Sequence, residues 1–147
     1  RRSEWGGAGM GGLPPGSPNP PVAAETRVLL GDSMGEMFAY YAACDIAFIG
    51  GSLLPLGGQN LIEAAALGKP TLIGPHTFNF AEAAEHAVQA GAALRVADAG
   101  ELAKMLEELF RSPERMRAMS ASALRFADTH RGATERLMAL IRPYLER

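Results

Sequence analysis

The chain has 147 residues, 48% of them hydrophobic and 20% charged, and a net charge of −2 at pH 7. This fits one globular domain, and the slightly acidic balance argues against nucleic acid as a partner, because binding along a phosphate backbone needs a basic surface. No apolar run approaches the roughly 20 residues that a membrane-spanning helix needs. Cys44 is the single cysteine, so an internal disulfide and a cysteine-based zinc site are both excluded.

The first 24 residues differ in composition from the rest of the chain. They are rich in Gly and Pro and show no periodicity of apolar residues. Because such a segment cannot build a packed core, we expect residues 1–24 to be a linker or disordered. The domain itself is expected to comprise residues 25–147. Since the sequence begins without Met, we also expect it to be a fragment of a longer protein.

From residue 26 onward, short apolar runs alternate with stretches of helical composition. Runs of this length bounded by Gly, Pro or Asp are typical of buried strands, which the pattern predicts at residues 26–30, 45–49, 71–73 and 92–96. Helices are predicted at residues 34–43, 60–66, 81–90, 101–110, 113–128 and 133–145. The first of these would be capped by Asp32 or Ser33. This alternation predicts an α/β fold: a Rossmann-like parallel sheet with helices on both faces, followed by C-terminal helices.

Residues 46–66 combine the features of a ligand site in such a fold. A buried strand is followed by Gly50-Gly51-Ser52, then by a second glycine pair, and then by a helix that begins near Asn60. Glycine lets the backbone approach a ligand closely, and the first N–H groups of a helix have no intrahelical partner. Ligands of parallel sheets bind at the carboxyl ends of the strands, where the polar loops of this chain would gather. We therefore expect a site for an anion or a sugar nucleotide there.

Two predicted helices carry a glutamate in the first turn, Glu36 and Glu63. A carboxylate there can accept hydrogen bonds from sugar hydroxyls while neighbouring N–H groups bind a phosphate, as a nucleotide-sugar requires. The alternative for each glutamate is a favourable interaction with the helix dipole, worth about 0.3–1 kcal/mol. Asn60 also fits a simple helix cap. His76 could donate to a phosphate or be an ordinary loop residue.

Several other kinds of site are disfavoured. No Walker lysine motif and no GxGxxG follows a predicted strand, which disfavours an ATPase and a dinucleotide-dependent dehydrogenase. Ser52 lacks the surrounding motif of a nucleophile. No cluster of His, Cys and Asp has the spacing of metal ligands. We therefore expect neither a metal nor a cofactor.

Four motifs, in this order, resemble a known family: GDSMGEM, DIAFIGGSL, GGQNLIEAA and GPHTFNF. They are similar to the C-terminal domain of 3-deoxy-D-manno-octulosonic acid (Kdo) transferase, a Gram-negative enzyme that glycosylates the lipid A precursor in lipopolysaccharide biosynthesis. The resemblance is dense over residues 29–96 and looser over the terminal helices. It implies one half of a GT-B glycosyltransferase, whose active site lies between two Rossmann-like domains. In this family the C-terminal domain binds the donor CMP-Kdo, and an inverting transfer proceeds without a metal.

The resemblance also implies roles for individual residues. Backbone groups around Met34 and Gly35 would contact the CMP phosphate, and the Gly50-Gly51 turn would allow close approach. Side chains of the two first-turn glutamates and of the asparagine would contact the nucleotide or the Kdo. The implied donor-binding residues are Met34, Gly35, Glu36, Gly50, Gly51, Asn60 and Glu63. No catalytic residue is implied in this chain, because the catalytic carboxylate of the family lies in the N-terminal domain.

The resemblance further implies partners and a location. The lipid A precursor would bind as acceptor through the N-terminal domain, which also carries the membrane anchor. The full-length protein would act on the cytoplasmic side of the inner membrane, whereas this chain alone would be a soluble fragment without transferase activity. The chain departs from the family in lacking a basic PRH-type motif on the first strand, unless Arg1 and Arg2 end that region.

Two alternatives remain open. The chain could belong to another GT-B protein, such as a UDP-sugar transferase or an epimerase, because these share the arrangement of glycine loop and helix start. It could also be a non-catalytic α/β module that binds other proteins. Binding of CMP, of UDP or UMP, or of no nucleotide distinguishes the three hypotheses.

Overall fold

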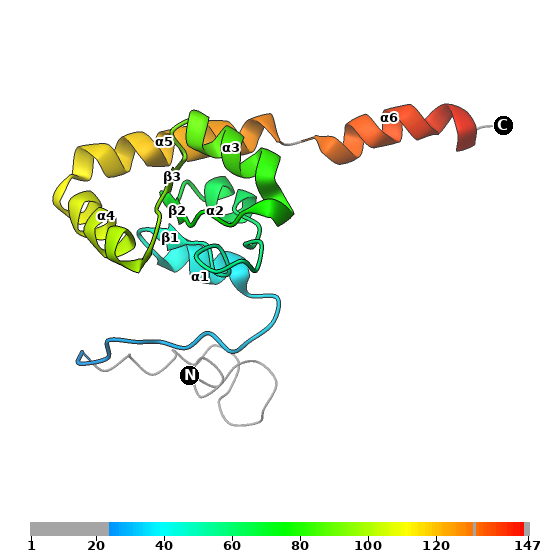
Figure 1. The fold of residues 1–147 in the computed structure, drawn as a ribbon. Coiled ribbons are helices and arrows are strands. Elements are labelled where there is room, and N and C mark those ends of the chain that lie inside the picture. Colours follow the sequence, from blue (N-terminus) through cyan, green and yellow to red (C-terminus); the bar gives the residue numbers. More distant parts are fainter. Residues whose placement is uncertain (1–23, 131, 146–147) are drawn as a thin grey trace, which may run out of the picture. The chain divides into compact units, whose positions relative to one another are not determined.

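The computed structural model describes residues 24–130 and 132–145, and Figure 1 shows the fold. The chain divides into two compact units with the boundary between Tyr40 and Tyr41, and each unit is described by itself. Residues 1–23, almost the whole of the predicted linker, lie outside the described residues. The division predicted at residue 24 therefore stays a prediction.

The strand predicted at residues 26–30 does not form. Residues 26–30 are irregular and contain no strand. Val28, Leu29 and Leu30 are 85%, 45% and 52% exposed. An apolar run becomes a strand only when a neighbour satisfies its N–H and C=O groups, so this prediction from local sequence was wrong.

Helix α1 (Met37–Ala43) begins later than the sequence predicted. Residue 34 was the expected start, but Gly35 has a φ of +78°, in the left-handed region that interrupts a right-handed helix. Because α1 begins at Met37, neither Ser33 nor Asp32 occupies the position directly before it. The Ser33 hydroxyl instead donates a hydrogen bond to Oε2 of Glu36. The turn that precedes the helix thus contains three of the implied donor-binding residues.

The second unit contains a three-stranded parallel sheet in the order β1-β2-β3. Its strands are β1 (Ala47–Phe48), β2 (Thr71–Ile73) and β3 (Ala93–Arg95). Thr71 of the central strand pairs with Ala47 on one side and with Ala93 on the other. The predicted parallel α/β fold is confirmed, with three strands in the described residues where four were predicted.

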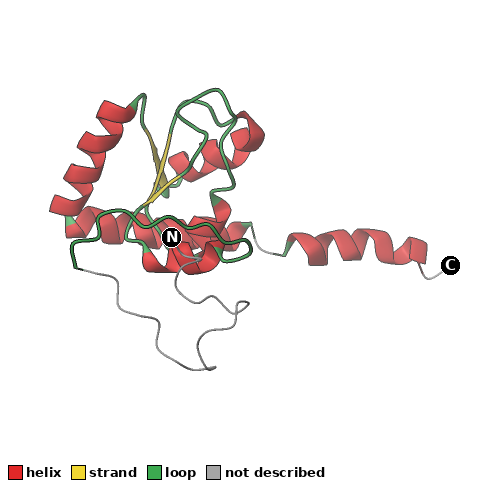
Figure 2. Cartoon of the chain, turned by 90° about the horizontal axis from the view of Figure 1, so that it is seen from below, coloured by secondary structure: helices red, strands yellow, loops and turns green. Residues whose placement is uncertain are grey.

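The helices of the second unit lie within a few residues of their predicted positions. They are α2 (Ile62–Ala66), α3 (Ala81–Gln89), α4 (Ala99–Arg111), α5 (Pro113–Thr129) and α6 (Ala133–Leu145). A 3-10 turn, Phe78–Phe80, precedes α3. Helix α4 begins before residue 101 because Asp98 caps it, accepting a hydrogen bond of 2.9 Å from the N–H of Glu101. Figure 2 shows the strands (yellow) among these helices (red).

Both faces of the sheet are covered by helices (Figure 1). On one face, Ile73 and Ala93 pack with buried residues of α2, α3 and α5. On the other face, the fully buried Leu72 packs with Leu109 of α4. Helix α5 contributes to both clusters, and its Ser120 hydroxyl donates to the carbonyl oxygen of Gly68, shortly before β2 begins. Helix α5 therefore lies near the amino ends of the strands and leaves their carboxyl ends to the loops.

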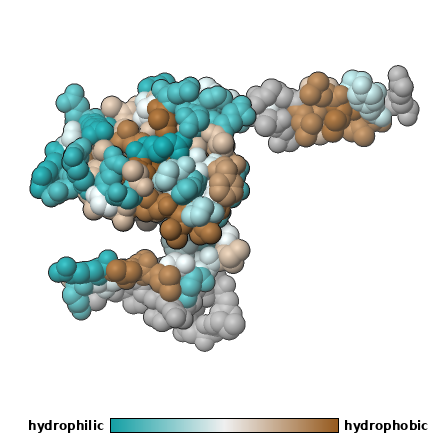
Figure 3. Space-filling view, viewed as in Figure 1, coloured by the Kyte–Doolittle hydropathy of each residue, from teal (hydrophilic) through white to brown (hydrophobic). Residues whose placement is uncertain are grey.

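Helix α6 presents its apolar side chains to solvent. Every side chain from residue 137 to residue 145 is exposed, and Figure 3 shows apolar atoms (brown) along this helix. Its exposed apolar side chains include Met138 (41%), Leu140 (70%), Ile141 (37%) and Leu145 (69%). Within the described ranges, no helix has both the length and the apolar character needed to cross a membrane.

Candidate functional site

The loop that follows β1, residues 50–61, depends on glycine for its path. Gly57 has a φ of +90° and lies so close to Asn79 that a Cβ atom would come within 2.5 Å of its Cγ atom. Gly58, at a φ of +72°, donates a hydrogen bond of 3.1 Å from its N–H to the carbonyl oxygen of Gly51. A side chain at Gly57 is therefore disfavoured by backbone conformation and would force the side chains of Asn79 and Phe78 to move. The loop folds back on itself before it enters α2.

Ser52 joins this loop to the loop that follows β2, residues 74–80. Its side chain is fully buried, and its hydroxyl donates to the carbonyl oxygen of Ile49. The same oxygen accepts a hydrogen bond of 2.8 Å from the N–H of Gly74. The carbonyl of Ser52 accepts a second one of 2.9 Å from the N–H of His76. Ser52 is thus a structural residue that fixes two loops at the carboxyl end of the sheet.

Asn79 joins the same two loops further along. Its Nδ2 group donates to the carbonyl oxygens of Leu56 and Gly58, both at 3.3 Å. Its backbone N–H donates to the carbonyl oxygen of Gly57 at 3.1 Å. The sequence motif containing Asn79 was recognised, but this residue was not singled out, because its partners lie about twenty positions earlier in the chain.

Arg95, at the end of β3, holds the loop after β2 from its other side. The guanidinium donates to the carbonyl oxygen of Gly74 at 3.1 Å and to the Thr77 hydroxyl at 3.2 Å, and it forms an ion pair with Glu85 of α3. Sequence reasoning missed this residue as well. The available signal was a lone arginine inside an apolar run, where a charged side chain needs partners.

The start of α2 differs in detail from the prediction. Asn60 was expected near the N-cap, but Leu61 occupies that position and makes no side-chain cap. The Oδ1 atom of Asn60 nevertheless accepts a hydrogen bond of 2.9 Å from the N–H of Ile62. The capping function expected of Asn60 is thus fulfilled from one residue further away, as in an Asx turn.

Glu63 lies in the first turn of α2, as predicted. Its side chain is half-buried, and it lies close enough to Tyr41 to affect its ionisation. Burial is the larger cause that raises the pKa of Tyr41, and the negative charge of Glu63 is the second. A half-buried carboxylate at a helix start next to a glycine loop is suited to accept hydrogen bonds from hydroxyl groups.

The implied donor-binding residues belong to both units. Met34, Gly35 and Glu36 lie in the first unit, in the turn before α1, where Met34 is 96% exposed. The other four belong to the second unit. There, Gly50 and Gly51 begin the loop after β1, and a Cβ atom added to Gly50 would have no neighbour within 4 Å. The structure brings Gly50, Gly51 and the start of α2 onto one loop-and-helix segment, while their role toward a ligand stays a prediction.

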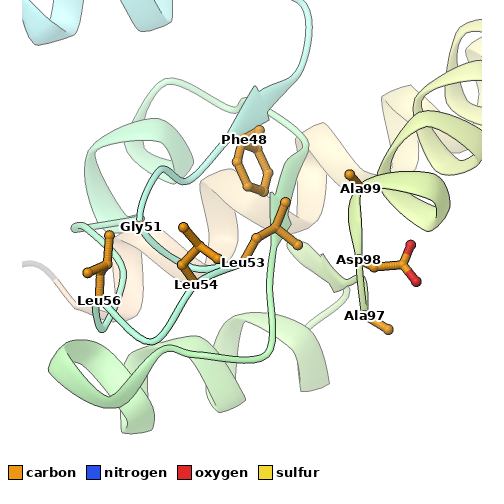
Figure 4. A pocket seen from close by; sticks show the side chains of 8 residues that line it. All are labelled: Phe48, Gly51, Leu53, Leu54, Leu56, Ala97, Asp98 and Ala99. Carbon is orange, nitrogen blue, oxygen red and sulfur yellow. The ribbon is translucent and has the colours of Figure 1, made fainter.

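A pocket of about 470 Å³ opens beside this loop. Figure 4 shows the loop leucines and Phe48 on one side and residues 97–99 on the other, with the Asp98 carboxyl pointing away from the leucines. The lining residues are Phe48, Gly51, Leu53, Leu54, Leu56, Ala97, Asp98 and Ala99. Sequence reasoning identified Gly51 but missed the three leucines. Among the described residues, no three His, Cys, Asp or Glu side chains form a group that could hold a metal ion.

Residues 21–126 match the family of group 1 glycosyl transferases. The chain belongs to this family. The match covers the loop after β1, the start of α2 and the loop after β2. The fold is accordingly half of a GT-B-type glycosyltransferase, in agreement with the parallel sheet and the C-terminal helices.

Two known proteins are similar to this chain over most of its length. The chain is 48% identical over 130 residues to the 3-deoxy-D-manno-octulosonic acid transferase of Bordetella pertussis. The aligned residues make up 88% of this chain and 29% of that protein. It is 42% identical to the enzyme of the same name from Haemophilus influenzae, over 83% of this chain and 29% of that protein. The chain therefore spans less than a third of the length of these relatives.

A solved structure is also similar to this chain in its fold. The C-terminal CMP-Kdo binding domain of WaaA from Acinetobacter baumannii is similar to this chain with a TM-score of 0.62 and 34% sequence identity. The similarity covers 65% of this chain and 50% of the chain in that structure. The resemblance to the C-terminal domain of Kdo transferases is confirmed.

Proposed function

We propose that this chain binds CMP-Kdo and is the donor-binding half of a Kdo transferase. The observation that carries the proposal is the glycine loop that leads from β1 to Asn60 and Glu63, in a chain similar to a domain described as binding CMP-Kdo. The loop lies at the carboxyl end of a parallel sheet, which is where such sheets bind nucleotides. Ser52 and Asn79 hold it in place.

Each implied residue has a role that suits its chemistry. In this proposal Glu63 accepts hydrogen bonds from the ribose hydroxyls. Because Oδ1 of Asn60 is engaged by the N–H of Ile62, Asn60 meets the donor through its Nδ2 amide, which suits phosphate or carboxylate oxygens. Gly50 and Gly51 let the ligand approach the backbone. Met34 and Gly35 supply backbone N–H groups to the phosphate, and Glu36 contacts the nucleotide or the Kdo.

The acceptor side of the reaction belongs to a different part of the protein in this proposal. The relatives are much longer than this chain, and we assign the lipid A precursor, the catalytic base and the membrane attachment to portions that the chain does not span. The complete protein would act at the cytoplasmic side of the inner membrane. The chain alone would bind the donor without transferring the sugar.

The test is the affinity for CMP of the chain and of its Glu63→Gln variant, measured by calorimetry. Gln keeps the shape of Glu but replaces an acceptor oxygen with a donor, so the two ribose hydroxyls can no longer both be accepted. Losing a hydrogen bond to a charged group costs about 1.5–3 kcal/mol, or roughly ten- to a hundredfold in affinity. Glu82→Gln, at the first turn of α3, is the matched control and should bind CMP as the unaltered chain does.

Three results would argue against the proposal. A Glu63→Gln variant that is less stable but binds CMP as tightly as the unaltered chain would mean that Glu63 stabilises the helix and does not contact the ligand. Tighter binding of UMP or UDP than of CMP would favour another GT-B enzyme that uses a UDP-sugar. Absence of any nucleotide binding by the unaltered chain would favour a non-catalytic module.

A further inference from the structure

We infer that Asn79 is a positioning residue for the donor site. Its amide group fixes the turn at residues 56–58, and this turn sets the path of the backbone to Asn60 and Glu63. The inference rests on the proposed function and extends it to a residue with no assigned role. The geometry points to Asn79 because this side chain and its own N–H bind three consecutive residues of the neighbouring loop, Leu56, Gly57 and Gly58.

The contact has little tolerance for change on the loop side. Leu56 and Gly58 present carbonyl oxygens to the same Nδ2 group at 3.3 Å. A Cβ atom on Gly57 would come within 2.4 Å of that Nδ2 atom. The turn is therefore shaped to fit an asparagine amide, whose two N–H donors can serve two carbonyl acceptors at once.

The turn also determines where the implied ligand contacts begin. Gly58 is separated from Asn60 by a single residue, and Gly58 is itself bonded to Gly51 through its N–H. Fixing Gly58 from two sides defines the path of the backbone into α2. A supporting contact of this kind affects binding because a ligand group displaced by a fraction of an ångström loses its hydrogen-bond geometry.

Asn79 can be altered without disturbing the core. Its side chain is exposed, and neither cluster of buried residues contains it. The deeper connection between the two loops, from Ser52 to Gly74, does not involve Asn79. Variants at Asn79 should therefore fold, and their effect on the loop can be separated from an effect on the sheet.

Two variants test the inference in this chain, with CMP as the probe. Asn79→Asp places a carboxylate, which cannot donate, against two carbonyl oxygens, whereas Asn79→Ala removes the donors without adding charge. Both should bind CMP about tenfold more weakly at a temperature well below every melting transition, because two hydrogen bonds that hold the turn are lost. Both should also speed hydrogen exchange at the N–H of Gly58. Ser120→Ala removes one hydroxyl bond near the amino ends of the strands and should leave CMP affinity unchanged.

Each other outcome overturns the inference in a recognisable way. Weakened binding with unchanged exchange at Gly58 would mean that Asn79 contacts the ligand itself. Faster exchange with unchanged affinity would mean that the turn does not shape the site. A loss confined to Asn79→Asp would show charge repulsion of the CMP phosphate. If the unaltered chain fails to bind CMP, the proposed function fails first and the inference falls with it.

Discussion

The hydroxyl oxygen of Ser52 accepts a hydrogen bond of 2.8 Å from the backbone N–H of Gly74, although the two residues lie 22 positions apart. Ser52 follows β1 and Gly74 follows β2, so this bond fixes the carboxyl ends of two neighbouring strands to each other. Both partners are buried. Their contact explains why a small hydroxyl residue and a glycine occur at these positions, and it yields the first two predictions.

Ser52→Ala should lower the free energy of unfolding by about 1–3 kcal/mol, because the buried N–H of Gly74 would lose its acceptor. Urea unfolding measures the effect. Ser122→Ala is the control, because the Ser122 hydroxyl accepts an exposed hydrogen bond from Arg125, and surface changes are usually within about 0.5 kcal/mol. Equal stability of the two variants would contradict a structural role for the Ser52 hydroxyl.

Gly74→Ala should be more disruptive than most glycine substitutions in this chain. The new Cβ atom would lie 2.2 Å from the carbonyl oxygen of Ser52, so the backbone must move, at a cost of about 1–3 kcal/mol or more. Gly50→Ala is the matched control, since a Cβ atom there meets nothing within 4 Å. Thermal melting should separate the variants clearly. A Gly74→Ala variant as stable as Gly50→Ala would show that the loops yield easily.

The pKa of Tyr41 should depend on Glu63. Burial first, then the charge of Glu63, raises the pKa of Tyr41 above its ordinary value of 10.0. Glu63→Gln removes a negative charge that disfavours the phenolate, so the pKa should fall toward 10.0. Absorbance titration of tyrosinate measures it, with Tyr41→Phe to identify the signal among the three tyrosines of the chain. Glu82→Gln should leave the titration as it is.

The same shift sets the direction of a pH effect on stability. The folded state binds the phenolic proton of Tyr41 more tightly than the unfolded chain does. The resulting stabilisation is fully present below pH 10 and is lost as the pH rises through the raised pKa. Urea unfolding across this alkaline range should show a smaller loss for Tyr41→Phe than for the unaltered chain. The same loss in both would exclude Tyr41 as a source.

Helix α6 should exchange its amide hydrogens much faster than the sheet. Its side chains from residue 137 to residue 145 are exposed, so little burial opposes local unfolding. In contrast, Leu72 and Ile73 of β2 are fully buried. Hydrogen exchange followed by mass spectrometry or NMR compares α6 with residues 46–49 and 71–73. Equal protection would mean that α6 is stabilised by contacts beyond those described.

The chain alone should form no glycosylated product from CMP-Kdo and the lipid A precursor. An inverting transfer needs a base to deprotonate the acceptor hydroxyl, and a positioned base contributes about 10²–10⁴-fold to the rate. None of the implied donor-binding residues is assigned this role. Product formation can be followed by mass spectrometry against a protein-free control. Turnover above that control would place a base within this chain.

Local sequence patterns were enough to predict the positions of most elements and the type of fold. The three paired strands and the helices of the second unit form near their predicted positions because apolar periodicity, Gly and Pro act within a few residues. The glycine loop and Glu63 in a first helical turn are local features of the same kind. Motif order was enough to identify the resemblance to Kdo transferases, which the comparison of sequences and structures confirmed.

Features that depend on residues far apart in the chain became visible only in the three-dimensional structure. Residues 26–30 have the composition of a strand, but a strand exists only where a neighbour pairs with its backbone. Ser52, Asn79 and Arg95 each also bind residues that lie between 10 and 23 positions away, and no local pattern specifies such contacts. The leucines likewise line a pocket only because the start of α4 lies across from them. Sequence thus predicted that polar loops would gather at the carboxyl ends of the strands, and packing determined which side chains hold the loops after β1 and β2 together.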